Sequence, residues 1–200
     1  MGIAERRIRE KEQVRASILK ASWQLVTEEG WQALSIRKIA EAIEYSVPVI
    51  YDYFANKEAI LLELTKQGFQ ILNAELVKAK KRSTNPEKQI EAMAYSYWEF
   101  AFDHKAYYQV MYGLGIPSCE TVNQIGELST FIELILQPIK DLIAASKNPD
   151  VDAFLKLHTF WSMLHGLISI NMMGSDTNRE ELNQMVLQDF IASFISGIKG

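Results

Sequence analysis

A single cysteine stands among the 200 residues of the sequence, and this scarcity excludes two kinds of stabilisation. One thiol cannot form an internal disulfide framework, and it cannot form a zinc site that needs several cysteines. No basic residue flanks Cys119 to activate its thiol, which favours an ordinary cysteine over a redox sensor. A chain without disulfides fits a reducing compartment, so we expect a cytoplasmic protein.

Long hydrophobic runs are also missing. The most apolar stretch, residues 160–173, is shorter than the ~20 residues that a membrane-spanning helix needs, and it contains His165. The first residues are charged from Glu5 onward and lack the apolar segment of a secretory signal. We therefore expect no membrane contact, and a buried helix at residues 160–173.

The sequence carries no excess of basic charge. Its formal net charge is −4, which argues against a chain that clamps nucleic acid over its whole surface. Residues 1–56 contain eight basic and eight acidic side chains, so this segment is neutral. Arg6, Arg7 and Arg9 form either a solvated helix face or an arm that reaches the backbone of flanking DNA.

Motifs of catalysis and of cofactor binding are absent from the sequence. There is no nucleophile elbow, no phosphate-binding loop and no pair of Glu-x-x-His ligand motifs. His158 and His165 are seven residues apart, so they share a helix face and could bind a metal with a further ligand. Histidines satisfied in a core or an interface are the favoured alternative. We predict that the protein is not an enzyme and has no catalytic residue, cofactor or metal site.

What the sequence does contain is hydrophobic residues at helical spacing. Such residues make up 48% of the chain, enough for a core in one or two domains. Their repeat of three and four residues predicts an all-α protein. Pro138 falls inside one predicted helix, where we expect a kink or an interruption. The predicted helices cover residues 8–29, two short stretches within 35–54, and residues 57–82, 87–102, 104–114, 120–145, 151–173 and 177–198. Gly30 is expected to end the first helix as a left-handed cap, and Asn56 and Asn85 are placed to cap the helices that begin at about residues 57 and 87.

Residues 35–54 predict two short helices joined by a tight turn. Ser35 is placed to cap the first helix, and Ser46 is placed to cap the second. Pro48 falls in the first turn of the second helix, where its missing N–H group costs no hydrogen bond. Ile50 and Phe54 are predicted to point inward. Two helices at a steep angle, the second with its N-terminal residues exposed, form the helix-turn-helix arrangement that places a recognition helix in the DNA major groove.

This segment resembles the N-terminal domain of the TetR family of transcriptional regulators. In that family the first domain binds operator DNA as a dimer, and a small ligand bound to the second domain releases the DNA. The resemblance implies a DNA-binding domain at residues 1–56 and a helical ligand-binding and dimerisation domain at 57–200, which begins with a linking helix over 57–82. It rests on Ile39-Ala40, Ser46, Ile50-Tyr51, Tyr53-Phe54 and Asn56-Lys57-Glu58, within a match that extends over residues 14–64.

Three residues depart from the pattern of that family. Glu44 stands where the family usually has Gly, Tyr45 where it has a small aliphatic residue, and Asp52 where it often has His. The turn at Glu44 is expected to need a left-handed backbone, which costs a non-glycine residue about 1 kcal/mol. Glu44 and Asp52 also bring negative charge toward a phosphate backbone, which bears on operator affinity rather than on the fold.

Several residues of the helix-turn-helix are predicted to contact DNA. Val47 and Pro48 offer apolar contact to thymine methyl groups but no hydrogen bond, so specificity would rely on few base contacts and on DNA shape. Lys57 lies in the first turn of the following helix and is predicted to hold a phosphate, with a plain surface lysine as the alternative. The predicted DNA contacts are Ser35, Arg37, Ser46, Val47, Pro48, Tyr51, Tyr53 and Lys57.

The larger predicted domain is rich in aromatic residues and methionine. Such side chains line apolar cavities for small molecules, and they also fill ordinary cores. The sequence leaves both possibilities open for each residue, whereas the resemblance implies that a cavity exists. The residues predicted to line it are Trp98, Phe102, Tyr107, Met111, Phe160 and Met163.

The last two predicted helices are the most apolar ones. A helix that is hydrophobic nearly all round needs partners on more than one side. We therefore predict a homodimer in which two helices from each partner meet across a two-fold axis. Trp161, His165 and Gly166 also resemble the tryptophan–histidine–glycine signature of one class of C-terminal domain in the TetR family. The predicted interface residues are Trp161, His165, Gly166, Phe190 and Phe194.

The function expected from this resemblance is ligand-responsive transcriptional regulation, most often repression. The implied partners are operator DNA and an unknown small-molecule effector of apolar or aromatic character. The alternative is a dimeric helical ligand-binding protein whose operator binding is weakened or lost. The neutral charge of residues 1–56, together with Glu44 and Asp52, motivates that alternative.

Overall fold

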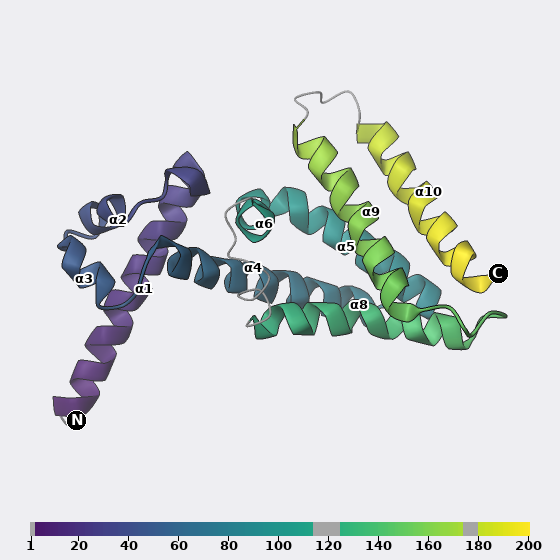
Figure 1. The fold of residues 1–200 in the computed structure, drawn as a ribbon, viewed down its shortest axis with the longest axis horizontal. Coiled ribbons are helices and arrows are strands. Elements are labelled where there is room, and N and C mark those ends of the chain that lie inside the picture. The colour runs from purple at the N-terminus through teal and green to yellow at the C-terminus, as the bar shows by residue number, and fades with distance from the viewer. Residues whose placement is uncertain (1–2, 114–124, 174–179) are drawn as a thin grey trace. The chain divides into compact units, whose positions relative to one another are not determined.

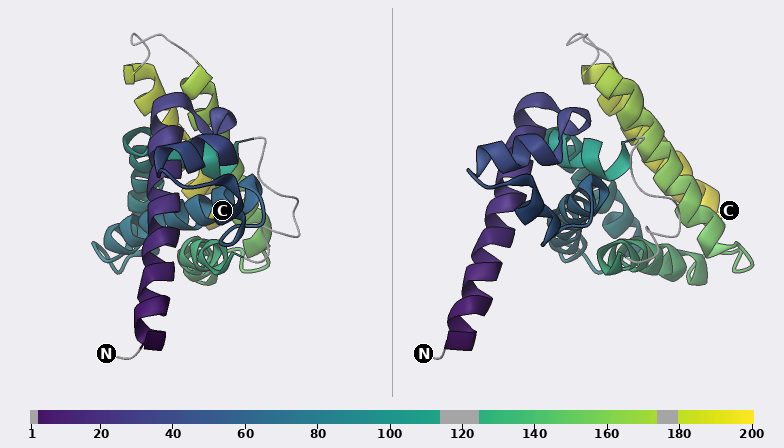
Figure 2. Two further views of the ribbon diagram at one scale, coloured as in Figure 1. Left: turned by 90° about the vertical axis from the view of Figure 1, so that its left-hand side faces the viewer. Right: turned by 60° about the vertical axis from the view of Figure 1, so that its left-hand side comes forward.

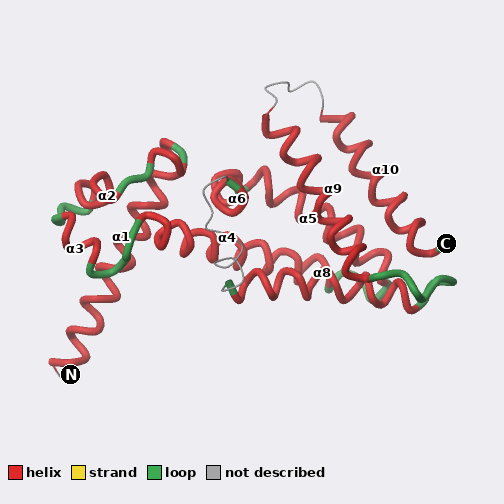
Figure 3. Tube along the Cα trace, viewed as in Figure 1, coloured by secondary structure: helices red, strands yellow, loops and turns green. Residues whose placement is uncertain are grey.

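The computed structural model describes residues 3–113, 125–173 and 180–200. Nine α-helices and one short 3-10 helix account for nearly all of them, and Figure 3 shows these helices in red with the described loops in green. The prediction of an all-α protein is confirmed. Cys119 lies outside the described residues.

The chain divides into two compact units. The first unit contains Met1–Phe69 and His104–Ile125, and the second contains Gln70–Asp103 and Gly126–Gly200. None of the described helices is long and apolar enough to cross a membrane.

The first unit is built around a long N-terminal helix, drawn in purple in Figure 1. Its hydrophobic core joins α1 to the helix-turn-helix and to the start of α4 through Ile18, Ile39, Ile50 and Leu64, all of them 0% exposed. Its elements are α1 (Ile3–Glu29), η1 (Trp31–Ala33), α2 (Ile36–Ala42), α3 (Val47–Tyr51), α4 (Lys57–Lys80) as far as Phe69, and α6 (Lys105–Tyr112).

Helix α1 begins five residues earlier than the predicted start at residue 8. Residues 4–13 are all exposed, so no apolar periodicity marks this part of the helix in the sequence. Pairs such as Arg6 with Glu10, joined at 2.9 Å across one helical turn, stabilise it instead. Gly30 follows the helix with φ 85° and ψ 156°. This conformation is open to glycine but is not the left-handed helical cap that we predicted.

The second unit is a bundle of long helices. Its core contains Tyr97, Phe100, Phe131 and Phe160, each at most 1% exposed. Helices α9 and α10 run antiparallel and pack against each other in Figure 1, and in the right-hand view of Figure 2 α9 lies in front of α10. The elements are α4 from Gln70 onward, α5 (Pro86–Asp103), α8 (Gly126–Ala144), α9 (Ala153–Met173) and α10 (Glu180–Lys199).

Side-chain caps explain why three of the helices begin where they do. The Oδ1 atom of Asn56 accepts the N–H of Ala59 at 2.8 Å, so the predicted cap of α4 is confirmed. Asn85 caps α5 in the same way, and Asp152 caps α9. Pro138 lies inside α8 without interrupting it.

The predicted domain boundary after residue 56 does not coincide with the division into compact units. Helix α6 packs within the first unit, where the ring of Tyr107 stacks on Trp23 with centroids 3.7 Å apart. Met111 lies so close to α4 that a Cβ added at Gly68 would meet its Sδ at 2.5 Å. The sequence pattern does not show to which unit the aromatic helix at residues 104–114 belongs, because the residues that it contacts are distant in the chain.

Candidate functional sites

The turn between α2 and α3 has the geometry expected of a helix-turn-helix. The Oγ atom of Ser35 accepts the N–H of Lys38 at 3.3 Å, which confirms the predicted cap of α2. Glu44 has φ 58°, so the predicted left-handed residue is present and is not a glycine. The next N–H, that of Tyr45, donates to the carbonyl of Ala40 at 3.0 Å and closes the turn.

Helix α3 exposes one face and buries the other. Ile50 is 0% exposed and anchors the helix in the core, whereas Tyr51 is 53% exposed and Pro48 also faces solvent. Val47 is half-buried against the core. Ser46 occupies the N-cap position, but its side chain makes no capping hydrogen bond, so that prediction is wrong. Its backbone carbonyl accepts the N–H of Val49 at 3.0 Å instead.

Two of the predicted DNA-contacting cations already have partners within the first unit. The Nζ atom of Lys57 donates to the carbonyl of Gln32 at 3.0 Å. Arg37 pairs with Glu41 at 2.8 Å on the exposed side of α2, and the hydrogen bond that it donates to Glu41 raises the pKa of Arg37. Tyr53 is half-buried and packs against the core, which limits the ring face that it can offer to DNA.

An ion-pair network fixes α4 to α1 beside the helix-turn-helix. Arg15 and Lys66 both bind Glu63, at 2.7 Å and 2.8 Å. Burial alone would raise the pKa of Glu63, but its hydrogen bonds to Lys66 and Arg15 outweigh burial and lower it. The guanidinium of Arg15 also lies 5.0 Å from the ring centroid of Phe54, within the range of a cation–π contact.

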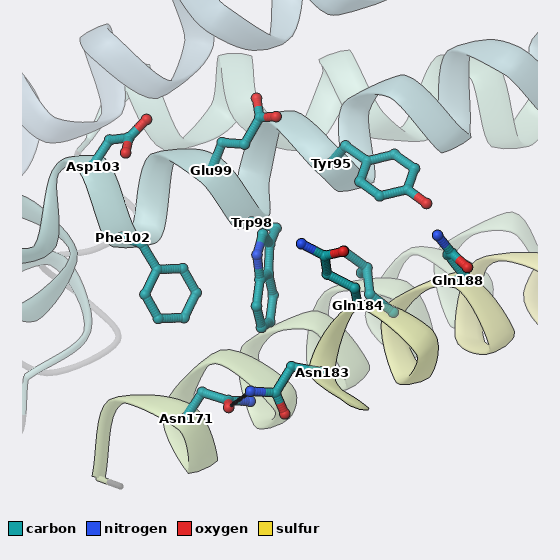
Figure 4. Close-up of a pocket in the computed structure, with 10 residues that line it drawn as sticks. Tyr95, Trp98, Glu99, Phe102, Asp103, Asn171, Asn183, Gln184 and Gln188 are labelled. Carbon is teal, nitrogen blue, oxygen red and sulfur yellow. Dashed lines mark hydrogen bonds between the residues drawn. The ribbon is translucent and has the colours of Figure 1, made fainter. Parts of the chain in front are cut away.

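A groove of about 680 Å³ lies in the second unit between α5 on one side and α9 and α10 on the other. Figure 4 shows Trp98 and Phe102 extending from α5 toward the two facing helices, with Asn171 and Asn183 hydrogen-bonded to each other opposite them. We call this space the α5–α10 groove. Its lining residues are Tyr95, Trp98, Glu99, Phe102, Asp103, Asn171, Asn183, Gln184, Leu187 and Gln188.

The structure does not bring the six predicted cavity residues together. Trp98 and Phe102 line the α5–α10 groove. Tyr107 and Met111 lie in the first unit, where burial raises the pKa of Tyr107. Phe160 is part of the core, and Met163 is 53% exposed on the surface of α9.

Sequence reasoning missed the polar residues of the groove. Gln184 and Gln188 are one helical turn apart on α10, and this spacing of two amides is the signal that the sequence offers. Asn171 comes from a different helix, so no local pattern could reveal that it meets Asn183.

The predicted interface residues divide between core and surface. Phe190 and Phe194 are buried against Phe160, with ring centroids 5.9 Å and 5.3 Å away, so they are core residues within one chain. The indole N–H of Trp161 donates to the hydroxyl oxygen of Tyr97 at 3.2 Å. Nothing lies within 4 Å of the position that a Cβ on Gly166 would take.

Large apolar side chains other than those predicted are exposed on α9 and α10. Most prominent are Ile170, which is 63% exposed, and Met185, which is 59% exposed. Burial lowers the pKa of His165 in this part of α9. No group of three residues that could hold a metal ion is found in the described part of the chain. The α9–α10 face comprises Leu155, Met163, Ile170, Leu182, Met185 and Val186.

Two family models match the chain. Residues 18–64 match the model described as bacterial regulatory proteins, tetR family. Residues 90–190, half of the chain, match the model described as tetracyclin repressor-like, C-terminal domain. A comparison with curated protein sequences finds no match.

Solved structures share the fold over nearly the whole chain. A protein with unknown function from Rhodococcus sp. RHA1 superposes with a TM-score of 0.76 at 22% identity, covering 93% of this chain and 95% of that one. The transcriptional regulator FadR from Bacillus subtilis, solved in complex with stearoyl-CoA, has a TM-score of 0.71 at 18% identity and covers 91% and 98%. The ketosteroid transcriptional regulator KstR2 of Mycobacterium tuberculosis has a TM-score of 0.64 at 20% identity and covers 93% and 95%.

Proposed function

The chain belongs to the TetR family of transcriptional regulators, and we propose that it is a repressor that leaves its operator when a small apolar or aromatic ligand binds its second unit. Members of this family are regulators and not enzymes, and this chain is accordingly a DNA-binding regulator. One observation carries the proposal. Helix α3 is anchored by Ile50 and presents Pro48 and Tyr51 to solvent, as a recognition helix must.

In the proposed complex, α3 lies in the major groove. Pro48 and the exposed edge of Val47 contact thymine methyl groups, and Tyr51 reaches a phosphate or a base edge. The proposed contacts to the phosphate backbone of the DNA come from Ser35, Arg37, Ser46, Tyr53 and Lys57. For Lys57 this means exchanging the carbonyl of Gln32 for a phosphate, which is favourable because a charged acceptor binds an ammonium more strongly than a neutral one.

The proposed repressor is a two-fold homodimer through α9 and α10. The α9–α10 face supports this, because soluble monomers rarely expose so many large apolar side chains on two neighbouring helices. Gly166 adds room for a close approach of a partner helix, since no described atom outside its own stretch of helix lies within 4 Å of an added Cβ. A two-fold dimer would read two half-sites spaced by about one turn of DNA. The assignment of the C-terminal domain to the tryptophan–histidine–glycine type remains a prediction.

The α5–α10 groove is the proposed effector site. Its volume of about 680 Å³ lies within the range of small-molecule sites, and Trp98 and Phe102 give it an apolar wall. The FadR of Bacillus subtilis was solved with stearoyl-CoA, and KstR2 is described as a ketosteroid regulator. Both names support a hydrophobic effector in this proposal.

A selection from random duplex DNA tests the proposed function. The wild-type chain is expected to enrich a two-fold symmetric sequence. Tyr51→Ala is expected to lose that enrichment, and Tyr51→Phe to keep the motif if the ring makes the contact. Enrichment of no motif by well-folded wild-type protein would contradict operator binding.

The alternative function is a dimeric ligand-binding protein with weak operator affinity. It is favoured by the internal partners of Lys57 and Arg37, which leave fewer free cations for phosphates. Glu44 and Asp52 add negative charge at the turn and at the end of α3. Ligand binding together with no preference over random DNA would favour this alternative.

A further inference from the structure

We propose that the α5–α10 groove selects an aromatic organic cation, and that it rejects anionic ligands such as acyl-CoA thioesters. This names the ligand class of the effector site and so rests on the proposed function. Binding to the groove can be measured without DNA, so the two proposals can fail separately.

The groove is elongated along α5 and α10. A smaller cavity of about 260 Å³ continues it and shares Tyr95 and Gln188 with it. The larger space alone suits a ligand of two or three fused rings, because small-molecule sites span about 300 to 1,000 Å³.

One wall of the groove is aromatic. The rings of Trp98 and Phe102 have centroids 4.7 Å apart and planes inclined at 48°. Phe102 is 40% exposed although it is a large apolar residue. Figure 4 shows both rings directed across the groove, so a planar ligand can lie against them.

The opposite wall is polar but uncharged. Asn171 of α9 and Asn183 of α10 hold each other by a hydrogen bond, which fixes their amide groups. Gln184 projects into the space beside Trp98 in Figure 4. These amides can orient a ligand, but they neutralise no charge on it.

The charge at the groove has one sign. Glu99 and Asp103 line it from α5, and its described lining contains no Lys, Arg or His. The smaller cavity adds Lys88, but that lysine is paired with Glu91 at 3.0 Å. In Figure 4 both carboxylates extend from the side of α5 away from Trp98 and Phe102, so they lie beside the groove and not among the rings. Negative charge beside the groove repels phosphates and attracts a cation, and an aromatic wall favours cations through the negative faces of its rings.

Helix geometry places Leu182 and Val186 of the α9–α10 face away from this groove. At 3.6 residues per turn, Gln184 lies about 200° around α10 from Leu182, and Val186 only about 40°. Met185 lies about 60° from Gln188, so it stands between the face and the groove. A partner chain that covers Leu182 and Val186 therefore leaves the side of α10 that carries Gln184 open.

The test compares ligands that share one ring system and differ in charge. Isothermal titration calorimetry on the full chain would use 10-methylacridinium as the cation, acridine at pH 8 as the neutral form and acridine-9-carboxylate as the anion. Stearoyl-CoA is a fourth ligand. We expect the cation to bind at least tenfold more tightly than the anion, with the difference shrinking at high salt. Equal affinities, or tighter binding of the anion or of stearoyl-CoA, would overturn the proposal.

A variant without the two carboxylates shows whether the cation binds in the α5–α10 groove. The double substitution Glu99→Gln with Asp103→Asn changes two exposed side chains and is expected to weaken the cation about tenfold without affecting acridine. Glu133→Gln on the exposed side of α8 is the matched control and is expected to change nothing. If the double variant binds the cation as the wild type does, the groove is not the site.

Discussion

Glu44 holds the turn between α2 and α3 in a backbone conformation that glycine adopts more easily. Its φ of 58° places the Cβ atom close to its own carbonyl, a contact that costs a non-glycine residue about 1 kcal/mol. The turn persists because Ile39 and Ile50, on either side of it, are fully buried. The packed helices on both sides outweigh the local cost.

Two substitutions of Glu44 distinguish the effect of its left-handed backbone from the effect of its negative charge. Glu44→Gly is expected to raise the stability of the chain by up to about 1 kcal/mol, because it relieves the left-handed backbone. Glu44→Gln keeps the strain and removes the charge, so its stability should match the wild type. Both variants should bind DNA more tightly than the wild type. Thermal unfolding and a DNA titration check these outcomes, and a glycine variant less stable than wild type would contradict the strain.

Glu63 predicts a pH dependence for the attachment of α4 to α1. The pKa of Glu63 is lowered in the folded state by Lys66 and Arg15, which overcome its partial burial. A carboxylate with a lowered folded pKa contributes stability above its unfolded pKa, about 4.3, and this stability is lost as the pH falls through the folded value. Glu63→Gln should therefore lower the melting temperature slightly at pH 7, since partly exposed pairs contribute little.

The difference between wild type and Glu63→Gln should vanish as the pH falls below 4, because both side chains are then neutral. Glu133→Gln, an exposed carboxylate on α8, serves as the control and should follow the wild type at every pH. A constant difference between Glu63→Gln and wild type from pH 7 to pH 3 would show that packing, and not charge, is responsible.

At the scale of elements, Gly68 determines how closely α6 approaches α4. A Cβ at this position would lie 2.5 Å from Sδ of Met111 and 3.3 Å from the ring of Tyr107. Met111 is only 2% exposed and has little room to move. The close contact of these two helices therefore depends on the absence of a side chain at Gly68.

Gly68→Ala is expected to destabilise the chain by about 1–3 kcal/mol, the usual cost of overpacking a core. Gly126→Ala is the matched control, because nothing lies within 4 Å of its added methyl group. In a helix that control should be neutral or stabilising by up to about 1 kcal/mol. Chemical denaturation compares the two, and equal stabilities would contradict the close packing of α4 and α6.

The sequence was informative wherever a local signal sets an element. The caps at Ser35, Asn56 and Asn85, and the inward positions of Ile50 and Phe54, followed from residue type and spacing alone. The first residues of α1 were missed because a solvated helix needs no apolar pattern. Ser46 was misjudged because a good cap residue at the right position does not oblige its side chain to bond.

Contacts between distant segments could not be read from the sequence. The sequence alone does not show whether Phe190 and Phe160 belong to an interface, a cavity or the core. The packing of α9 against α10 places both in the core. The α5–α10 groove needs residues from three helices, and only Trp98 and Phe102 of its lining had been singled out. Periodicity states which face is apolar but not which neighbour covers it.

At the scale of the whole molecule, the proposed dimer depends on the α9–α10 face. Ile170→Glu and Met185→Glu place charges on residues that are 63% and 59% exposed in the single chain, so the fold should be kept. In a dimer each charge would be buried without a partner, which should weaken association about a hundredfold or more. Gln184→Glu, an exposed residue about 200° around α10 from Leu182, is the control.

Sedimentation at several concentrations distinguishes the outcomes. Wild type and Gln184→Glu should remain dimers under conditions in which Ile170→Glu and Met185→Glu are monomers. If all four proteins sediment alike, the subunits do not associate through this face.

We claim that this chain recognises a specific DNA sequence, and fluorescence anisotropy measures this recognition. Labelled fragments from the regions flanking its own gene would be titrated with the protein over a salt series, beside random duplexes of equal length and composition. We expect at least one fragment to bind on the order of 10³-fold more tightly than random DNA, with both affinities falling as salt rises. Equal affinity for every duplex at every salt concentration would contradict the claim and favour the ligand-binding alternative.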